Sequence, residues 1–123
     1  SGGLFDALEN FRRVNPGVWL ELDAERAVSP EVARSLPPGV EKGWSLVGGV
    51  GEYELLFAVP TGMTVADAVK IGCGGFAAQG ACDFRIMYGG KIGHMSTPPP
   101  DYRAIPRGNW LAETASYWTS LWR

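Results

Sequence analysis

Apolar side chains recur at helical spacing at the start of the chain. Leu4, Leu8 and Phe11 lie three or four positions apart, and most of the charged residues fall between them. This pattern predicts an amphipathic helix over residues 3–14, which Asn15-Pro16-Gly17 ends because proline cannot continue the helical hydrogen bonds. Residues 18–22 then alternate between apolar and polar side chains and predict a short strand.

A second helix is predicted shortly afterwards. Ser29-Pro30 is a typical helix start, since serine caps free amides and proline fits the first helical position. We expect this helix from Pro30 to Leu36, where Pro37-Pro38-Gly39 stops it. The same proline step is the boundary expected between an N-terminal extension, residues 1–43, and a core, residues 44–123, of one compact domain.

The middle of the chain predicts strand, strand, helix and strand in close succession. Two β-rich runs, residues 44–50 and 53–59, flank a tight-turn signal and are expected to pair as a hairpin. Thr64 and Asp67 have the spacing of a helix cap, and Gly72 suits the end of the helix that would follow. The apolar spacing after Thr64 predicts that this helix buries Val65, Ala68, Val69 and Ile71. Residues 84–88 alternate in polarity and predict a third strand.

The segment Met87-Tyr88-Gly89-Gly90-Lys91-Ile92, placed after a hairpin and a helix, resembles the third strand and short turn of ubiquitin-like β-grasp domains. Residues 59–65 resemble the entry to the helix of that family, and residues 100–105 resemble the turn before its last strand. The resemblance covers residues 44–122. It implies an α+β fold, with a β-grasp-like mixed sheet packed on one main helix, here preceded by an N-terminal helical extension.

The resemblance also implies protein binding through the sheet, as in the ubiquitin-like domains of viral replicase polyproteins and phage tail-assembly proteins. Two features depart from the family. The chain ends Leu121-Trp122-Arg123 without the Gly-Gly that conjugation or sulfur-carrier chemistry requires, and residues 1–43 have no counterpart in the minimal fold.

The last segment, residues 109–123, fits two patterns. Its apolar positions lie on one face of a helix, whereas its aromatic content over residues 116–122 is typical of a strand. Because a β-grasp needs a final strand beside the first, we expect a strand there and keep the helix as the alternative. Residues 95–100, which include three consecutive prolines, are expected to form an extended surface loop.

Composition favours a soluble globular domain. The chain has 123 residues, 46% of them hydrophobic and 20% charged, and no apolar run approaches the ~20 residues that span a bilayer. No signal peptide is evident, so we expect a cytoplasmic protein. The net charge is −2, and the basic residues form at best a loose group rather than a clustered basic face. Nucleic-acid binding is therefore a secondary alternative. The cations that would serve it are Arg85, Lys91, Arg103 and Arg107.

The two cysteines allow several kinds of chemistry. Cys73 and Cys82 are expected to be reduced and partly buried, and a disulfide between them is an alternative. A cysteine-dependent hydrolase is a further alternative, in which Cys82 would be the nucleophile and His94 its base. Asp83 or Asp101 would then orient the imidazole. Neither a metal site nor a cofactor is expected, because the chain has no Cys-x-x-Cys pair and no phosphate-binding glycine motif.

Five tryptophans are many for a core of this size, because each indole N–H also needs a partner. We therefore expect some of the C-terminal aromatic residues at the surface, with closure of the core as the alternative. The function that this composition favours is a non-enzymatic protein–protein interaction module, part of a larger assembly or multidomain polypeptide. Weak self-association is also possible. The expected partner-binding residues are Trp44, Tyr88, Trp110, Trp118, Leu121, Trp122 and Arg123.

Overall fold

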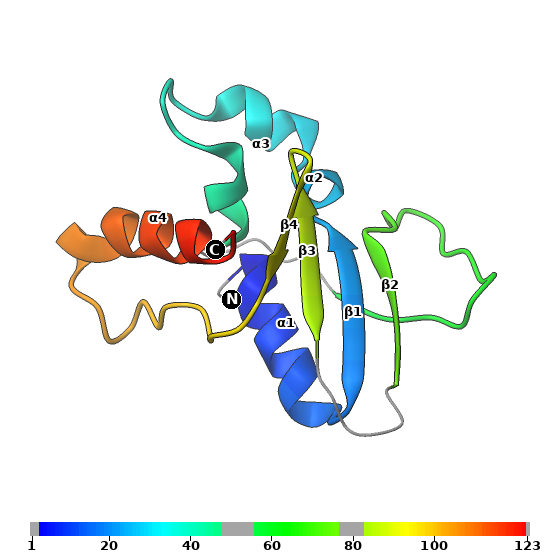
Figure 1. Ribbon diagram of the computed structural model, residues 1–123. Helices are drawn as coiled ribbons and strands as arrows, with labels where there is room; N and C mark the ends of the chain where they lie inside the picture. The colour runs from blue at the N-terminus through cyan, green and yellow to red at the C-terminus, as the bar shows by residue number, and fades with distance from the viewer. Residues whose placement is uncertain (1–2, 48–55, 77–82, 123) are drawn as a thin grey trace.

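The computed structural model describes residues 3–47, 56–76 and 83–122, and it has an α+β architecture (Figure 1). Helices and strands follow one another along the chain as α1 (Gly3–Val14), β1 (Val18–Asp23), α2 (Ala24–Ala27), α3 (Pro30–Ser35), η1 (Lys42–Leu46), β2 (Gly72–Phe76), β3 (Phe84–Tyr88), β4 (Lys91–His94), η2 (Arg107–Asn109) and α4 (Trp110–Ser120). The α+β class predicted from the sequence is confirmed.

The four strands form one mixed sheet in the order β2-β1-β3-β4. Strand β1 pairs antiparallel with β2 and parallel with β3, and β3 pairs antiparallel with β4. A strand from the expected N-terminal extension therefore lies in the interior of the sheet. Residues on both sides of the proline step at 37–39 contribute to a single sheet.

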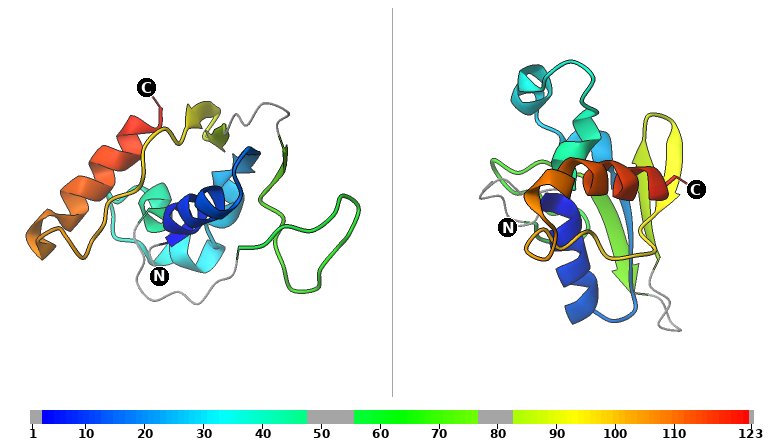
Figure 2. Two further views of the ribbon diagram at one scale, coloured as in Figure 1. Left: turned by 90° about the horizontal axis from the view of Figure 1, so that it is seen from below. Right: turned by 90° about the vertical axis from the view of Figure 1, so that its left-hand side faces the viewer.

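Helix α1 lies across one face of this sheet, and α4 lies beside the β4 edge (Figure 2). Alternate side chains of β1 and β3, including Leu22 and Ile86, point to this face and are buried there against Phe5 and Leu8 of α1. Burying side chains of this size stabilises the fold by about 1.5–3 kcal/mol each. The opposite face of the sheet is covered by no element of the described residues.

Four of the predicted elements are confirmed. Helix α1 and strand β1 have almost the predicted bounds, and β3 matches residues 84–88. Helix α3 begins after Ser29, whose hydroxyl accepts a hydrogen bond from the backbone N–H of Val32 at 3.2 Å. These elements depend on local signals that are complete within a few residues.

The predicted hairpin is not formed where the structure describes it. Residues 44–46 belong to the 3₁₀ helix η1, which starts where the Glu41 side chain accepts from the N–H of Gly43. Residues 56–59 form no strand, and residues 48–55 lie outside the described part of the chain. Leu46 and Val47 are buried on the helical face, so tertiary packing outweighs the β propensity of this run.

The helix predicted after Thr64 is also wrong. Asp67 has a φ of 62°, which a right-handed helix does not allow. The following residues run into β2 instead: the N–H of Asp23 donates to the carbonyl of Ile71 at 2.7 Å. Gly72, expected to end a helix, therefore begins a strand. The predicted helix would be too short to be stable on its own, so the pairing of these residues with β1 determines their conformation.

The C-terminal segment is the helix α4, so the predicted strand over residues 116–122 is wrong and the helical alternative is confirmed. Tyr117, Trp118 and Leu121 lie on one side of this helix and are buried in the core. The helix also reaches the edge of the sheet, where the N–H of His94 donates to the carbonyl of Leu121 at 3.0 Å.

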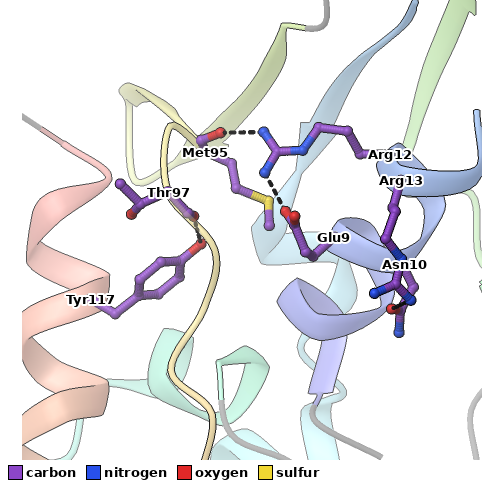
Figure 3. Close-up of polar contacts among 7 residues, drawn as sticks. All are labelled: Glu9, Asn10, Arg12, Arg13, Met95, Thr97 and Tyr117. Carbon is purple, nitrogen blue, oxygen red and sulfur yellow. Dashed lines mark hydrogen bonds and ion pairs between the residues drawn. The ribbon is translucent and has the colours of Figure 1, made fainter. Parts of the chain in front are cut away.

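The loop before α4 is held between two helices (Figure 3). Arg12 of α1 donates to the carbonyl of Met95 at 3.2 Å, and its guanidinium also pairs with Glu9. From the other side, the hydroxyl of Tyr117 donates to the carbonyl of Thr97 at 3.1 Å. The loop over residues 95–100 forms no helix or strand, and its first residue, Met95, is buried rather than at the surface.

Candidate protein-interaction surface

Most of the aromatic residues expected to bind a partner are packing residues. Trp118 is 7% exposed and meets Tyr88 edge-to-face, with ring centroids 4.9 Å apart, and Trp122 at 5.1 Å. Leu121 is buried beside them, and Trp44 packs against the same core. The expectation that Trp118 and Leu121 lie at the surface is therefore wrong, because α4 turns them inward. Arg123 lies outside the described residues.

Tyr88 is tied into this cluster by its hydroxyl. The hydroxyl donates a hydrogen bond to a carboxylate oxygen of Glu41, and the ammonium group of Lys42 lies 5.8 Å from the ring centroid. Burial, together with the Glu41 carboxylate, raises the pKa of Tyr88 well above its usual range. The ring is thus fixed in the fold rather than offered to a partner.

Among the described members of the expected set, Trp110 is the most exposed, at 37%. Its ring meets Tyr102 edge-to-face at 5.6 Å, the guanidinium of Arg107 lies 5.6 Å from its centroid, and its indole N–H donates to the carbonyl of Ile105 at 2.9 Å. Leu111 beside it is also exposed. The polar atom of the ring is already bonded, so Trp110 presents mainly apolar surface.

The imidazole of the hydrolase alternative contacts Asp83, one of the two aspartates named as alternatives for orienting it. Nδ1 of His94 lies 2.9 Å from Oδ1 of Asp83, on the open face of the sheet, and both side chains are about half exposed. Asp101 is engaged elsewhere: Arg103 donates two hydrogen bonds to it and thereby lowers its pKa. Cys82 lies outside the described residues.

Most of the four cations of the nucleic-acid alternative are engaged by partners within the chain. Arg85 pairs with Glu21 across the sheet at 3.8 Å, Arg103 pairs with Asp101, and Arg107 stacks on Trp110. Lys91 is exposed on β4. Three of the four thus have a partner within the chain, on different elements.

A surface that the sequence did not indicate lies next to β2. Residues 56–71, which we call the arm, form no helix or strand and extend beyond β2 (Figure 1). Five of their large apolar side chains are between 41% and 72% exposed. They are Phe57, Val59, Met63, Val65 and Val69. The signal in the sequence was the apolar spacing after Thr64, but that spacing predicted a buried helix face.

Within the described residues, strand β2 has no partner on its outer edge. The backbone N–H and C=O groups of Ile71 and Cys73 point toward β1. Because these directions alternate along a strand, the N–H and C=O groups of Gly72, Gly74 and Phe76 point away from the sheet. In the described part of the chain these outward groups have no backbone partner. The ring of Phe76 is 74% exposed. We call this edge together with the arm the β2–arm surface.

The glycines of β2 are required by its neighbour. A Cβ atom at Gly72 would overlap the carbonyl oxygen of Glu21, and one at Gly74 would lie 2.6 Å from the carbonyl oxygen of Trp19. The strand can therefore pair with β1 only without side chains at these positions. As a result, β2 has few side chains of its own to protect its outer edge.

A shallow hollow of about 320 Å³ lies where the arm joins β2. It is lined by carboxylates, cations and sulfur atoms, among them Glu21, Arg26, Cys73 and Met87. Cys73 is exposed, contrary to the expectation that it is partly buried, because β2 is an edge strand. Among the residues that the structure describes, no three His, Cys, Asp or Glu side chains gather as a metal ion requires.

Comparisons with protein families, with curated proteins and with solved structures find no match to this chain. Within residues 3–47, 56–76 and 83–122, no helix has the length and apolar character needed to cross a membrane.

Proposed function

We propose that this chain is a non-enzymatic protein–protein interaction module, and that it binds through the β2–arm surface. The observation that carries the proposal is the arm, a run of consecutive residues that holds five exposed apolar side chains beside an open strand edge. Large apolar side chains exposed in number are typical of interaction sites in soluble proteins.

The energetics of the arm support this proposal. Each large apolar side chain gains about 1.5–3 kcal/mol when it is removed from water. In the described structure Phe57 and Val69 do not obtain this gain, although the core of the same chain buries residues of equal size. A partner that covers the arm would supply it.

The open strand edge adds a second mode of recognition. An extended peptide can pair with exposed backbone groups, which give affinity without requiring a particular sequence. Side chains near the edge, here Phe76 and the arm, then select the partner. The combination suits a component of a larger assembly or of a multidomain polypeptide.

The proposal keeps one part of the resemblance to ubiquitin-like domains, a mixed sheet packed on one helix. These domains pack a mixed sheet on one main helix, and here α1 occupies that position instead of residues 64–71. From this resemblance we also propose that the larger assembly could be a viral replicase polyprotein or a phage tail.

Site-specific photo-crosslinking tests the proposed function. A photoreactive residue is placed at Phe57 or at Val69 of the arm. The matched control carries it at Val14 of α1, which is 71% exposed, as Val69 is at 72%. In extract of the source organism, the arm positions are expected to give a discrete crosslinked protein that the Val14 position does not. The same products from all three positions would refute the β2–arm surface as a binding site.

The contact between His94 and Asp83 keeps a cysteine-dependent hydrolase as a second candidate. In this candidate Cys82 would be alkylated much faster than the exposed thiol of Cys73 near neutral pH, because a base partner increases the thiolate fraction. Mass spectrometry after brief alkylation measures both rates. Faster labelling of Cys73 would exclude the hydrolase.

A further inference from the structure

The two outer edges of the sheet differ in their protection. At the β4 edge the end of α4 lies against the strand: a Cβ atom at Gly93 would overlap the carbonyl oxygen of Leu121, which also accepts from the N–H of His94. At the β2 edge, no described residue bonds to the outward backbone groups. Open edges pair readily with other strands, and proteins commonly block them with charged side chains or proline. Strand β2 has neither.

The sequence of β2 is complementary to itself. If two copies pair antiparallel about Gly74, then Gly72 of each copy lies opposite Phe76 of the other, and Gly74 lies opposite Gly74. All three positions have outward backbone groups, so each pair can exchange two hydrogen bonds. An aromatic ring opposite a glycine covers the backbone that the glycine exposes. No charged residue of β2 would meet its own copy.

We propose that β2 pairs with β2 of a second copy of this chain, which joins the two sheets into one continuous eight-stranded sheet. This inference rests on the proposed function, and it names the partner of the β2–arm surface as the chain itself. The two-fold symmetry follows from the antiparallel register, because the same strand serves both copies.

The arm contributes the area that the strands alone lack. A stable dimer buries about 1,200–2,000 Å² in total, which is more than a pair of five-residue strands supplies. The arm extends past β2 and lies on the helical side of the sheet (Figures 1 and 2). From there each arm reaches the second copy, and its apolar side chains, Phe57 among them, are covered in the dimer.

The test uses two lysine substitutions on opposite edges of the sheet. Phe76→Lys places a charge on the proposed interface, and Ile92→Lys places the same charge on the protected β4 edge; the two side chains are 74% and 55% exposed, respectively. Sedimentation velocity is measured from micromolar to millimolar concentration, under reducing conditions that exclude disulfide-linked dimers. Circular dichroism confirms that both variants are folded.

We expect the wild-type chain and Ile92→Lys to dimerise with rising concentration, and Phe76→Lys to dimerise about tenfold more weakly or worse. In the wild-type chain, the N–H of Gly74 should exchange with deuterium more slowly as the concentration rises. This measurement needs no variant.

Three results would overturn the proposal: a wild-type chain that stays monomeric up to millimolar concentration, equal dimerisation of both variants, or a Gly74 amide whose exchange does not depend on concentration. A monomer that is still crosslinked to another protein through Phe57 would overturn self-pairing alone and leave the proposed function standing.

Discussion

Replacement of Gly43 by alanine tests the packing of α4 on the rest of the fold. A Cβ atom at this position would overlap Cζ2 and Cη2 of Trp118. The indole cannot easily move away, because Phe5, Tyr88 and Trp122 contact it edge-to-face, with centroids 6.3, 4.9 and 5.1 Å away. The substitution therefore adds one methyl group to a part of the core that is already filled.

The expected loss of stability follows from this overlap. Overpacking of a filled core costs about 1–3 kcal/mol, whereas replacement of glycine by alanine gains about 0.4–1 kcal/mol by restricting the unfolded chain. We therefore expect Gly43→Ala to lower the free energy of unfolding by about 1–2 kcal/mol. For a domain of this size, Tm should fall by about 4–8 °C.

Gly108→Ala is the matched control, since a Cβ atom there meets nothing within 4 Å. Thermal and urea unfolding, followed by circular dichroism, should show no loss of stability for this variant. Gly43→Ala combined with Trp118→Phe should lose less stability than the sum of the single variants, because the smaller ring leaves room for the methyl group. Strict additivity, or a Gly43→Ala variant as stable as Gly108→Ala, would refute the described packing.

Three further predictions concern the core, a helix cap and alkaline pH. Phe5→Ala removes a fully buried ring that contacts α4 and should cost about 3–5 kcal/mol, whereas the exposed Leu111→Ala should change little; urea unfolding of both variants checks this. Ser29→Ala should cost about 1 kcal/mol because the N–H of Val32 loses its acceptor, and equal unfolding midpoints for variant and wild type would contradict the cap. Burial raises the pKa of Tyr88 and of Tyr117 above its usual range, so the folded state holds these protons more tightly than the unfolded state. Their contribution to stability is complete below about pH 10, the pKa of an unfolded tyrosine, and falls as the pH rises further. Denaturation between pH 8 and pH 11 should show a shallower decline for the variant in which both are phenylalanine, and an unchanged slope would oppose this assignment.

The elements that could be predicted from the sequence carry their signals locally. Helix α3, for example, needs only the hydroxyl of Ser29 and the proline after it. The C-terminal aromatic residues carry no such signal, because their spacing fits both a helix and a strand. Contacts with residues far away in the sequence, such as the contact of Trp118 with Gly43, stabilise the helix. The local sequence pattern does not contain this information.

The candidate site was missed for a related physical reason. The apolar spacing after Thr64 is the same whether those side chains are buried in a helix face or exposed on an arm. The outcome depends on β1, which pairs with the residues around Ile71 and pulls them into an edge strand. Sequence periodicity predicts which side chains share a face, but not whether the fold provides a surface to cover them.

The open edge and the exposed arm have a common origin in the glycines of β2. Gly72 and Gly74 allow the strand to approach β1, where a side chain would overlap its backbone. The same absence of side chains leaves the arm with nothing on β2 to pack against and leaves the outer backbone groups uncovered. A larger residue could not close this surface from within the chain without breaking the pairing with β1. No other described residue covers the edge or the arm. For this reason we propose that another molecule is recognised there rather than at the aromatic cluster around Trp118.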